Sequence, residues 1–480
     1  MVETWRRTWT GPHQLEAVRG ASTAAEGVAT QESPRPPDQA ARRGSIRIDA
    51  GSSVPPRRLL FINQYYWPDH ASTAQHLTDL AESLAAQGHD VHVVCSRGGY
   101  RDGAPRPPRH EVHNRVTIHR VDATALGRRN TVTRMTDYLS FYFRAFWLCL
   151  FLPRFDVVTT LTTPPIIGLI GTLLRRLKGS RHIYWSMDLH PDASLALGRM
   201  SIRQPVVRLL AWLSDLVYRE ADKVVVLGPY MMDRIAAKRV RTERLTMIPV
   251  WSRRDEIYPM PREDHPLREE LGLEGKFVAM YSGNLGLAHC FGEFLEAARR
   301  LRHRDDVVFL FVGDGPRLAE LQSVQSAEGL ANIRFLKYFP REMLHASLTT
   351  ADVHLISMRE EMTGIVVPGK LYGAMASGRP TLFVGPDHCE SADTIRWADC
   401  GATIRLGDVD SLVAAIEGFA NDHEGALEMG RQGRSAFLDR HEKDGCCAAW
   451  AEMIGGVVTV PAPHFASWRK TPIAMAAGPR

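Results

Sequence analysis

The sequence contains no apolar run long enough to cross a bilayer. Its longest, Tyr138–Pro153 (YLSFYFRAFWLCLFLP), is shorter than the roughly 20 residues that a transmembrane helix needs, and Arg144 interrupts it. The first residues, MVETWRRTWTGPHQ, lack the apolar segment of a signal peptide. We therefore expect a cytoplasmic protein in which Tyr138–Pro153 forms a buried or interfacial helix.

Several sequence motifs are also missing. No loop completes GxGxxG or a Walker A motif, so a dehydrogenase or a P-loop NTPase has little support. Seven cysteines are scattered along the chain and none forms CxxC. This usage indicates buried, reduced thiols rather than a zinc site or a disulfide framework.

The net charge of the chain is small, but its charged residues are unevenly distributed. The formal net charge of +5 is too small to indicate a nucleic-acid partner by itself. Between Arg101 and Arg181, however, the sequence has fourteen Arg and Lys residues and only five Asp and Glu residues. This excess suits an anionic membrane surface; a solvated basic face is the alternative.

What is present points to a globular protein of two or three domains. The chain has 480 residues, of which 44% are hydrophobic and 24% charged. Residues 1–56 are rich in Ala, Arg, Pro, Ser and Gly and show no apolar period, so we expect them to be disordered.

From residue 57 onward, strand and helix patterns alternate. Leu59–Asn63 is a short apolar strand, and the helix after it has Ser72 or Thr73 as a candidate N-cap and ends at Gly88. Similar units continue to a proline-rich linker at about 250–267, where a second series begins. The pattern predicts an α/β protein of two Rossmann-like, doubly wound domains facing across a cleft.

We place the first domain at 57–250 and the second at 251–440, with a C-terminal helix and tail at 441–480 that return to the first. Three loops of the second domain carry glycines between a strand and a helix: YSGNLGLAHC, VGDGPR and VVPGKLYGAMASGRP. Such loops let a ligand approach the backbone and the helix N-terminus. With Lys370 at a helix start, they predict a phosphate site; tight turns and a surface lysine are the alternative.

These stretches, with INQYYWPDHASTAQHLTDLAESLAAQGHDVHVV, MDLHPDASLALG and TADVHLISM, resemble the retaining GT-B glycosyltransferases of the GT4 type. The likeness is greatest to the colanic-acid and lipid-linked-oligosaccharide branch, and it covers roughly Arg57–Ile454. It implies an enzyme that moves a sugar, of hexosyltransferase type, from a UDP- or GDP-linked donor to a saccharide or lipid-linked acceptor for a cell-surface polysaccharide. The nucleotide-sugar is a substrate, and no cofactor is expected.

The resemblance implies roles for residues of the second domain. Gly283, Asn284 and Lys370 would meet the diphosphate, Lys337–Phe339 would line the base pocket, and Glu390 would reach a sugar hydroxyl. The donor-binding set is Gly283, Asn284, Gly313, Gly315, Lys337, Tyr338, Phe339, Pro368, Gly369, Leu371, Glu390, Ser72 and Thr73. An acid near a helix N-cap is the alternative for Glu390.

In the first domain, Ser72 and Thr73 replace the glycine pair of the family's phosphate loop, and Asp69 and His70 lie beside the cleft on the acceptor side. The segment WSMDLHPD ends a strand and groups Asp188, His190 and Asp192. The catalytic candidates are Lys370, His190 and Asp188, and Asp192 is placed with the acceptor; ordinary loop polars and helix caps are the alternative. The resemblance also implies that transfer needs no dedicated protein base, since in this family the leaving diphosphate oxygen can take the acceptor's proton.

Two departures from the family leave alternatives open. A glutamate common in the family is replaced by Gly373, and the basic pair often found after the first glycine loop is absent from GNLGLAHC. An inactive homologue that binds a nucleotide-sugar or a partner therefore remains as an alternative. A sugar-nucleotide 2-epimerase, another enzyme of the same architecture, is a second alternative. No DxD motif anchors a metal in the cleft, so metal independence is expected. Contact with the inner face of the plasma membrane, through Phe141–Phe151, competes with a plain core helix there.

Overall fold

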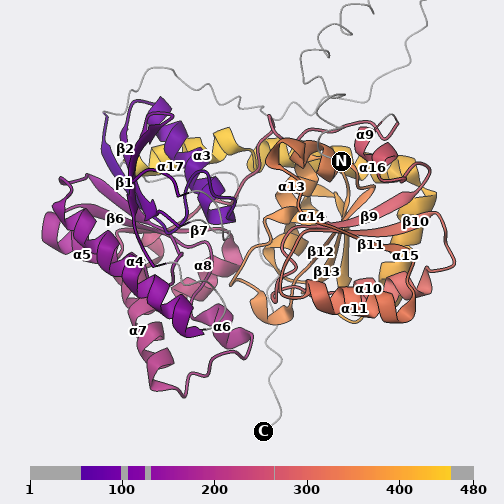
Figure 1. Cartoon of the computed structure of the whole chain (residues 1–480), viewed down its shortest axis with the longest axis horizontal. Coiled ribbons are helices and arrows are strands. Elements are labelled where there is room, and N and C mark those ends of the chain that lie inside the picture. The colour runs from indigo at the N-terminus through magenta and orange to yellow at the C-terminus, as the bar shows by residue number, and fades with distance from the viewer. Residues whose placement is uncertain (1–55, 99–105, 125–130, 264, 456–480) are drawn as a thin grey trace, which may run out of the picture. The chain divides into compact units, whose positions relative to one another are not determined.

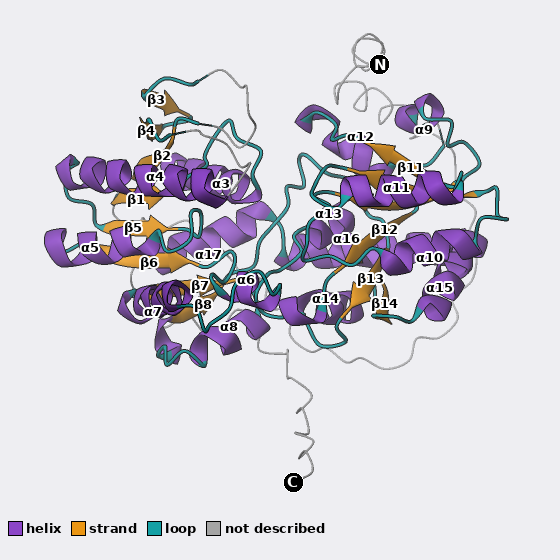
Figure 2. Cartoon of the chain, turned by 60° about the horizontal axis from the view of Figure 1, so that its bottom comes forward, coloured by secondary structure: helices purple, strands orange, loops and turns teal. Residues whose placement is uncertain are grey.

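The computed structural model describes residues 56–98, 106–124, 131–263 and 265–455 (Figure 1). The extension predicted to be disordered, residues 1–56, lies outside the described residues apart from its last position, and so does the predicted tail after residue 455. Helices and strands alternate along the described chain, and the strands form two sheets (Figure 2).

The first sheet has eight strands in the order β3-β4-β2-β1-β5-β6-β7-β8. Its strands are β1 (Arg58–Ile62), β2 (Asp90–Ser96), β3 (His110–His113), β4 (Val116–Val121), β5 (Val157–Thr160), β6 (Arg181–Trp185), β7 (Lys223–Val226) and β8 (Leu245–Met247). Only the edge pair β3 and β4 is antiparallel among the described strands. The helices of this domain are α3 (Ser72–Ala86), α4 (Thr131–Phe151), α5 (Gly168–Lys178), α6 (Asp192–Ala196), α7 (Pro205–Glu220) and α8 (Pro229–Ala236).

Strand β1 shows why helices cover both faces of this sheet. Its side chains alternate between the faces, as the period of two in a strand requires. Leu59 and Phe61 belong to the core that α3 helps to form, while Leu60 and Ile62 pack in the core that includes Phe141 of α4. All four are buried, so the run is continuously apolar, as is typical of a parallel strand.

The second sheet has six strands in the order β11-β10-β9-β12-β13-β14, and all its neighbouring strands are parallel. They are β9 (Phe277–Ser282), β10 (Val307–Val312), β11 (Ile333–Leu336), β12 (Val353–Ser357), β13 (Thr381–Gly385) and β14 (Gly401–Arg405). The helices are α9 (Pro266–Glu270), α10 (Gly292–Arg300), α11 (Leu318–Glu328), α12 (Leu344–Thr349), α13 (Lys370–Ala376), α14 (Glu390–Ala398), α15 (Val409–Asn421) and α16 (His423–Arg440).

The last described helix, α17 (Lys443–Gly455), packs against α3 of the first domain. Its Trp450 lies 4.6 Å, centroid to centroid, from Trp185 at the end of β6. Trp185 also stacks on Trp251, where the chain leaves the first domain, at 5.7 Å. The crossing between the domains is therefore buried among tryptophans.

Two expectations about local structure were wrong or incomplete. Helix α3 begins at Ser72 with Ala71 as its N-cap residue and without a side-chain cap, so neither Ser72 nor Thr73 is the N-cap. Thr73 Oγ1 instead accepts a hydrogen bond from Asn63 Nδ2 at 3.4 Å. Strands β3, β4, β8 and β14 were not predicted; β4 buries His119 and Arg120, which break its apolar pattern.

Among the described residues, no helix has the length and apolar character that a membrane span requires. All seven cysteines are free thiols, and all are buried except the half-buried Cys290, in line with the expectation of reduced thiols. Helix α4 is amphipathic: Phe141, Ala145 and Cys149 are buried, whereas Phe143 and Phe151 on its other side are exposed.

Candidate functional site

Two glycine loops meet where parallel strands β9 and β10 end. Gly283 follows β9 and Gly313 follows β10, with φ angles of +128° and +150° that favour glycine. A Cβ on Gly313 would lie 2.1 Å from the carbonyl oxygen of Gly283, and a Cβ on Gly283 would lie 2.6 Å from Lys370 Cε. The absence of side chains lets the loops stack and admits the lysine.

Lys370, the first residue of α13, extends into these loops. Its Nζ lies 3.0 Å from His289 Nε2 and 3.5 Å from the carbonyl oxygen of Asn284. It also lies 4.8 Å from the centroid of the Tyr281 ring, within cation–π distance. The hydroxyl of Tyr281 donates to the same Asn284 carbonyl at 2.8 Å. The ammonium is thus fixed beside the first glycine loop.

His289 determines how Lys370 is held. Its Nδ1 lies 2.5 Å from the carbonyl oxygen of Ser357. Because a carbonyl can only accept, Nδ1 must carry the proton, which leaves Nε2 of the neutral ring as an acceptor for Lys370. Burial, and next the charge of Lys370, lower the pKa of His289 to about 3, so the ring is neutral at pH 7.

Lys370 retains some solvent contact, but burial lowers the pKa of its amine to about 7. No carboxylate among the described residues forms an ion pair with it. A bound anion would restore the charged form, because an opposite charge nearby favours ionisation. The site therefore has one cationic group that an anionic ligand would complete.

The other predicted donor residues differ in their exposure and contacts. Pro368 is buried, Gly369 is exposed as the residue before α13, and Leu371 is a core residue that can offer only its backbone. Gly315 packs its backbone against Asn284. Lys337 and Tyr338 are exposed after β11, and Phe339 packs partly against the core.

Glu390 begins α14 and is buried, with 3% of its surface exposed. Its Oε1 accepts a hydrogen bond from the backbone nitrogen of Met231 at 3.1 Å, near the start of α8 in the first domain. Its Oε2 has no hydrogen-bond partner among the described residues. Burial raises the pKa of Glu390 to about 7. It therefore caps a helix of the first domain and keeps one oxygen unused.

The motif after β6 comes close to the loop before Lys370. The backbone nitrogen of Leu189 donates to the carbonyl oxygen of Ile365 at 3.1 Å. Leu189 lies between Asp188 and His190, so these two candidates flank a link between the domains. Burial raises the pKa of Asp188.

Asp192, by contrast, forms an ion pair with Lys238 at 3.1 Å, within the first domain. The remaining candidates lie around the start of α3. His70 and Ser72 are exposed, and Asp69 Oδ1 accepts from the backbone nitrogen of His70 at 2.9 Å. Within the described residues, no hydrogen bond joins this loop to Lys370, so its part in donor binding stays a prediction.

Sequence reasoning missed His289. The family's basic pair is absent, yet a histidine three residues after Gly286 contacts the lysine of another loop. The signal was present in GNLGLAHC, but only the fold brings residues 289 and 370 together. Gly373 lies in α13, where an added Cβ would meet only Leu348 Cδ1, at 3.5 Å.

No group of three or more His, Cys, Asp or Glu side chains suited to a metal ion occurs within the described ranges. The expected metal independence stays a prediction.

Comparison with known proteins identifies the class. Residues 73–251 match the family model for a glycosyl transferase 4-like domain, and residues 264–436 match that for glycosyl transferases group 1. The two matches together span most of the described chain. The protein is therefore a glycosyltransferase of the GT-B fold, a transferase enzyme.

Individual relatives are more distant. A Pseudomonas aeruginosa protein named as a glycosyltransferase, WbjE, is 28% identical over 55% of this chain and 66% of its own. An Escherichia coli protein named as a colanic acid biosynthesis glycosyl transferase, WcaI, is 26% identical over 75% of this chain and 91% of its own.

Solved structures share the fold at low identity. Sucrose-phosphate synthase from Thermosynechococcus elongatus aligns with a TM-score of 0.67 at 16% identity, over 83% of this chain and 98% of its own. Anabaena HepE, solved with UDP-glucose, aligns with a TM-score of 0.62 at 15% identity, over 84% and 100%. These likenesses confirm the predicted fold, and the alternatives of an inactive homologue or an epimerase are not favoured.

Proposed function

We propose that this enzyme transfers a hexose from a UDP- or GDP-linked donor to a saccharide acceptor of a cell-surface polysaccharide, with retention of anomeric configuration. The observation that carries the proposal is Lys370, held beside the first of two stacked glycine loops with no carboxylate partner among the described residues. The UDP-glucose bound by HepE and the polysaccharide role in the name of WcaI support the donor and acceptor classes.

The chemistry follows from charge. When the sugar–phosphate bond breaks, negative charge grows on the diphosphate, and a fixed cation beside it stabilises the transition state more than the ground state. Lys370 has that role in the proposal. Asp188 and His190, at the link to the Ile365 loop, would orient the sugar or the acceptor. Helix α13 has only seven residues, so the proposal rests on the lysine rather than on the helix terminus.

A thermal-shift screen tests donor binding. UDP-, GDP-, ADP- and TDP-sugars are compared on the wild type, on Lys370→Ala and on Lys223→Ala, a lysine of the first sheet. We expect one nucleotide class to raise Tm in the wild type and in Lys223→Ala but not in Lys370→Ala. An equal shift in all three proteins would contradict the donor site. NMR of the product's anomeric proton then decides between retention and inversion.

We further propose that the acceptor is lipid-linked and that the first domain docks on an anionic bilayer. Eleven of the fifteen large hydrophobic side chains exposed on the described chain lie on or just before three helices of this domain, α4, α5 and α7. They are Met135, Leu139, Phe143, Trp147, Phe151, Leu173, Leu177, Ile202, Val206, Leu209 and Trp212. Helix α5 contacts both α4 and α7. An exposed apolar surface of this kind marks an interaction site.

Charge favours a membrane as the occupant. Exposed arginines accompany the apolar residues on each helix: Arg144 on α4, Arg176 on α5 and Arg208 on α7. Apolar side chains flanked by basic ones are typical of interfacial helices on anionic lipid. The competing interpretation of Phe141–Phe151 as a core helix holds for one face of α4 only.

Vesicle sedimentation tests the membrane contact. The wild type and the control Leu438→Glu, an exposed leucine of α16, should bind vesicles with 30 mol% phosphatidylglycerol and not pure phosphatidylcholine vesicles. Trp147→Glu/Phe151→Glu should lose binding while keeping its Tm response to the donor. If the double variant binds vesicles like the wild type, or instead abolishes a concentration-dependent dimer, the surface does not serve the membrane.

A further inference from the structure

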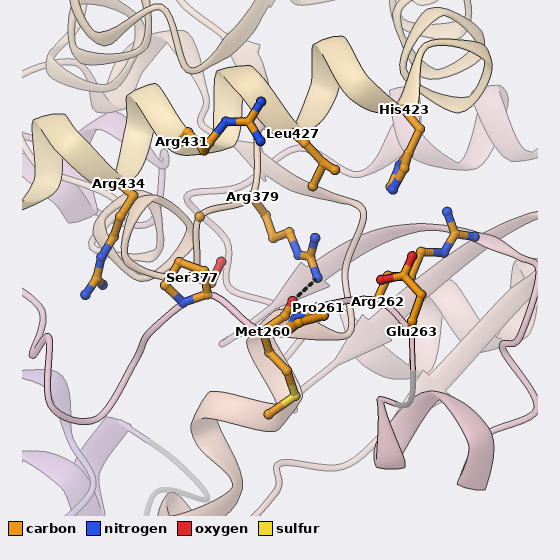
Figure 3. Close-up of a pocket in the computed structure, with 12 residues that line it drawn as sticks. Met260, Pro261, Arg262, Glu263, Ser377, Arg379, His423, Leu427, Arg431 and Arg434 are labelled. Carbon is orange, nitrogen blue, oxygen red and sulfur yellow. Dashed lines mark hydrogen bonds between the residues drawn. The ribbon is translucent and has the colours of Figure 1, made fainter. Parts of the chain in front are cut away.

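A second basic site lies beside the amino ends of the strands of the second sheet, away from the glycine loops. A pocket of about 510 Å³ is bounded by the linker before α9, the end of α13 and one side of α16 (Figure 3). Its lining residues are Pro259, Met260, Pro261, Arg262, Glu263, Ser377, Gly378, Arg379, His423, Leu427, Arg431 and Arg434. Ser377–Arg379 precedes β13, so the pocket is at the amino ends of the strands, whereas the glycine loops follow their carboxyl ends.

Positive charge dominates this pocket. Four arginines and His423 line it, against one carboxylate, Glu263. Two of the arginines have acidic partners outside the lining: Arg262 with Asp352 at 3.5 Å and Arg431 with Glu428 at 2.7 Å.

The other two arginines, Arg379 and Arg434, bond only to backbone carbonyls among the described residues. Their positive charge is therefore not neutralised by a direct ion pair. Burial lowers the pKa of both guanidinium groups, the direction expected of a cation that lacks a close anion.

Arg379 is the least expected of these residues. It is 3% exposed, and its Nε has no hydrogen-bond partner within the described part of the chain. One terminal nitrogen donates to the carbonyl oxygens of Met260 at 2.9 Å and Thr349 at 3.0 Å. Figure 3 shows the guanidinium extending towards the Met260–Pro261 backbone, below Leu427. A buried cation with an unused donor is costly unless an anion pairs with it.

We propose that this pocket binds the phosphate group of a small phosphorylated molecule, with Arg379 as its central ligand. Guanidinium groups match phosphate oxygens in geometry and charge. The volume exceeds that of a bare phosphate and falls in the range of small-molecule sites, about 300–1,000 Å³. Pro259, Pro261 and Leu427 supply an apolar wall for the body of a sugar phosphate. This site goes beyond the proposed function, which it does not require.

The pocket and the donor lysine lie at the two ends of α13, which runs from Lys370 to Ala376. The carbonyl oxygen of Ala376 accepts from Arg434, so the end of the helix is bonded to a wall of the pocket. Occupation of the pocket would therefore act on the helix that presents Lys370. An anionic effector of donor binding is the expected biological use.

The test is made in a Lys370→Ala background, so that phosphate binding in the donor loops does not contribute. Inorganic phosphate and glucose 1-phosphate are titrated by calorimetry, at ionic strength held constant with sodium chloride. Leu427→Trp fills the pocket without changing charge, and Leu438→Trp places the same side chain on an exposed position of α16. Arg379→Met removes the central cation.

We expect the Lys370→Ala protein to bind glucose 1-phosphate more tightly than inorganic phosphate. Leu427→Trp should weaken binding about tenfold or more, because the indole would block the phosphate from the guanidinium groups, and Leu438→Trp should leave it unchanged. No binding of either probe, or equal binding by the Leu427→Trp and Leu438→Trp proteins, would overturn the proposal. Arg379→Met should lose binding too; folded protein that still binds would remove Arg379 from the site.

Discussion

Donor binding should take up a proton, because burial holds the pKa of Lys370 at about 7. At pH 7 about half of the unliganded molecules then have a neutral amine, and at pH 8 about nine tenths. A diphosphate next to Nζ favours the ammonium and raises this pKa. We therefore expect binding of the nucleotide-sugar to take up about 0.5 proton at pH 7 and about 0.9 at pH 8.

The affinity should change with pH in one direction. Well below pH 7 the amine is already charged, so affinity is constant. Above pH 7 each binding event must protonate Lys370, and affinity falls by up to about tenfold per pH unit until the pKa of the complex is passed. Lys370→Arg keeps its charge throughout this range, so its affinity should be nearly independent of pH.

Calorimetry in two buffers of different ionisation enthalpy measures the proton uptake directly. Glu390 has a pKa raised to about 7 and is the competing group, so the titrations are repeated on Glu390→Gln, which keeps the amide oxygen for the Met231 nitrogen. The reasoning is refuted if the wild type takes up no proton at pH 8, or if Lys370→Arg shows the same pH slope as the wild type.

Three further changes probe the same site. His289→Ala removes the acceptor for Lys370 and should weaken donor binding about 3- to 10-fold, whereas His289→Gln, with a side-chain oxygen, should recover most of it in the same titration. Gly283→Ala places a Cβ 2.6 Å from Lys370 Cε at a φ of +128°; the donor-induced Tm shift should disappear, with a destabilisation of about 1 kcal/mol or more. Glu390→Gln removes an acid whose pKa is higher in the folded protein than in the unfolded chain. Ionising this buried acid lowers the stability of the wild type, and the loss grows as the pH rises from the unfolded pKa to about 7. Urea unfolding should show the variant more stable by about 1–3 kcal/mol at pH 8, and by much less at pH 5.

The fold could be predicted because each domain repeats an unambiguous local pattern. Continuous apolar runs such as Val307–Val312 are buried on both faces, which is the pattern typical of a parallel strand. The missed strand β4 has polar side chains whose burial depends on tertiary partners. His119 bonds to His92 at 2.9 Å and Arg120 to Glu111 at 2.6 Å, so their polarity is satisfied only after the sheet forms.

The candidate site likewise contains residues that the local sequence reveals and residues that only the fold reveals. The approach of Gly283, Gly313 and Lys370 to one another could be predicted, because glycines at strand ends and a lysine at a helix start can be recognised from the local sequence. His289 could not, because its importance comes from Ser357 on β12 and Lys370 on α13. Glu390 was predicted as a sugar ligand or a helix-terminal acid; the structure shows that it caps a helix of the other domain, which no local pattern encodes.

The absent basic pair changes how this site can hold a diphosphate. Two permanent cations would bind the donor equally at all neutral pH values. Here a neutral His289 accepts a hydrogen bond from one lysine, which orients the ammonium without adding charge. If the site binds a diphosphate as proposed, the proton that Lys370 gains on binding becomes part of the donor's affinity. Adding a permanent cation, as in Ala288→Lys beside the first loop, should strengthen donor binding at pH 6 and by less at pH 8, because at pH 8 the new charge opposes the proton that Lys370 must take up. An equal gain at pH 6 and pH 8 in the calorimetric titration would show that Lys370 is already charged without ligand.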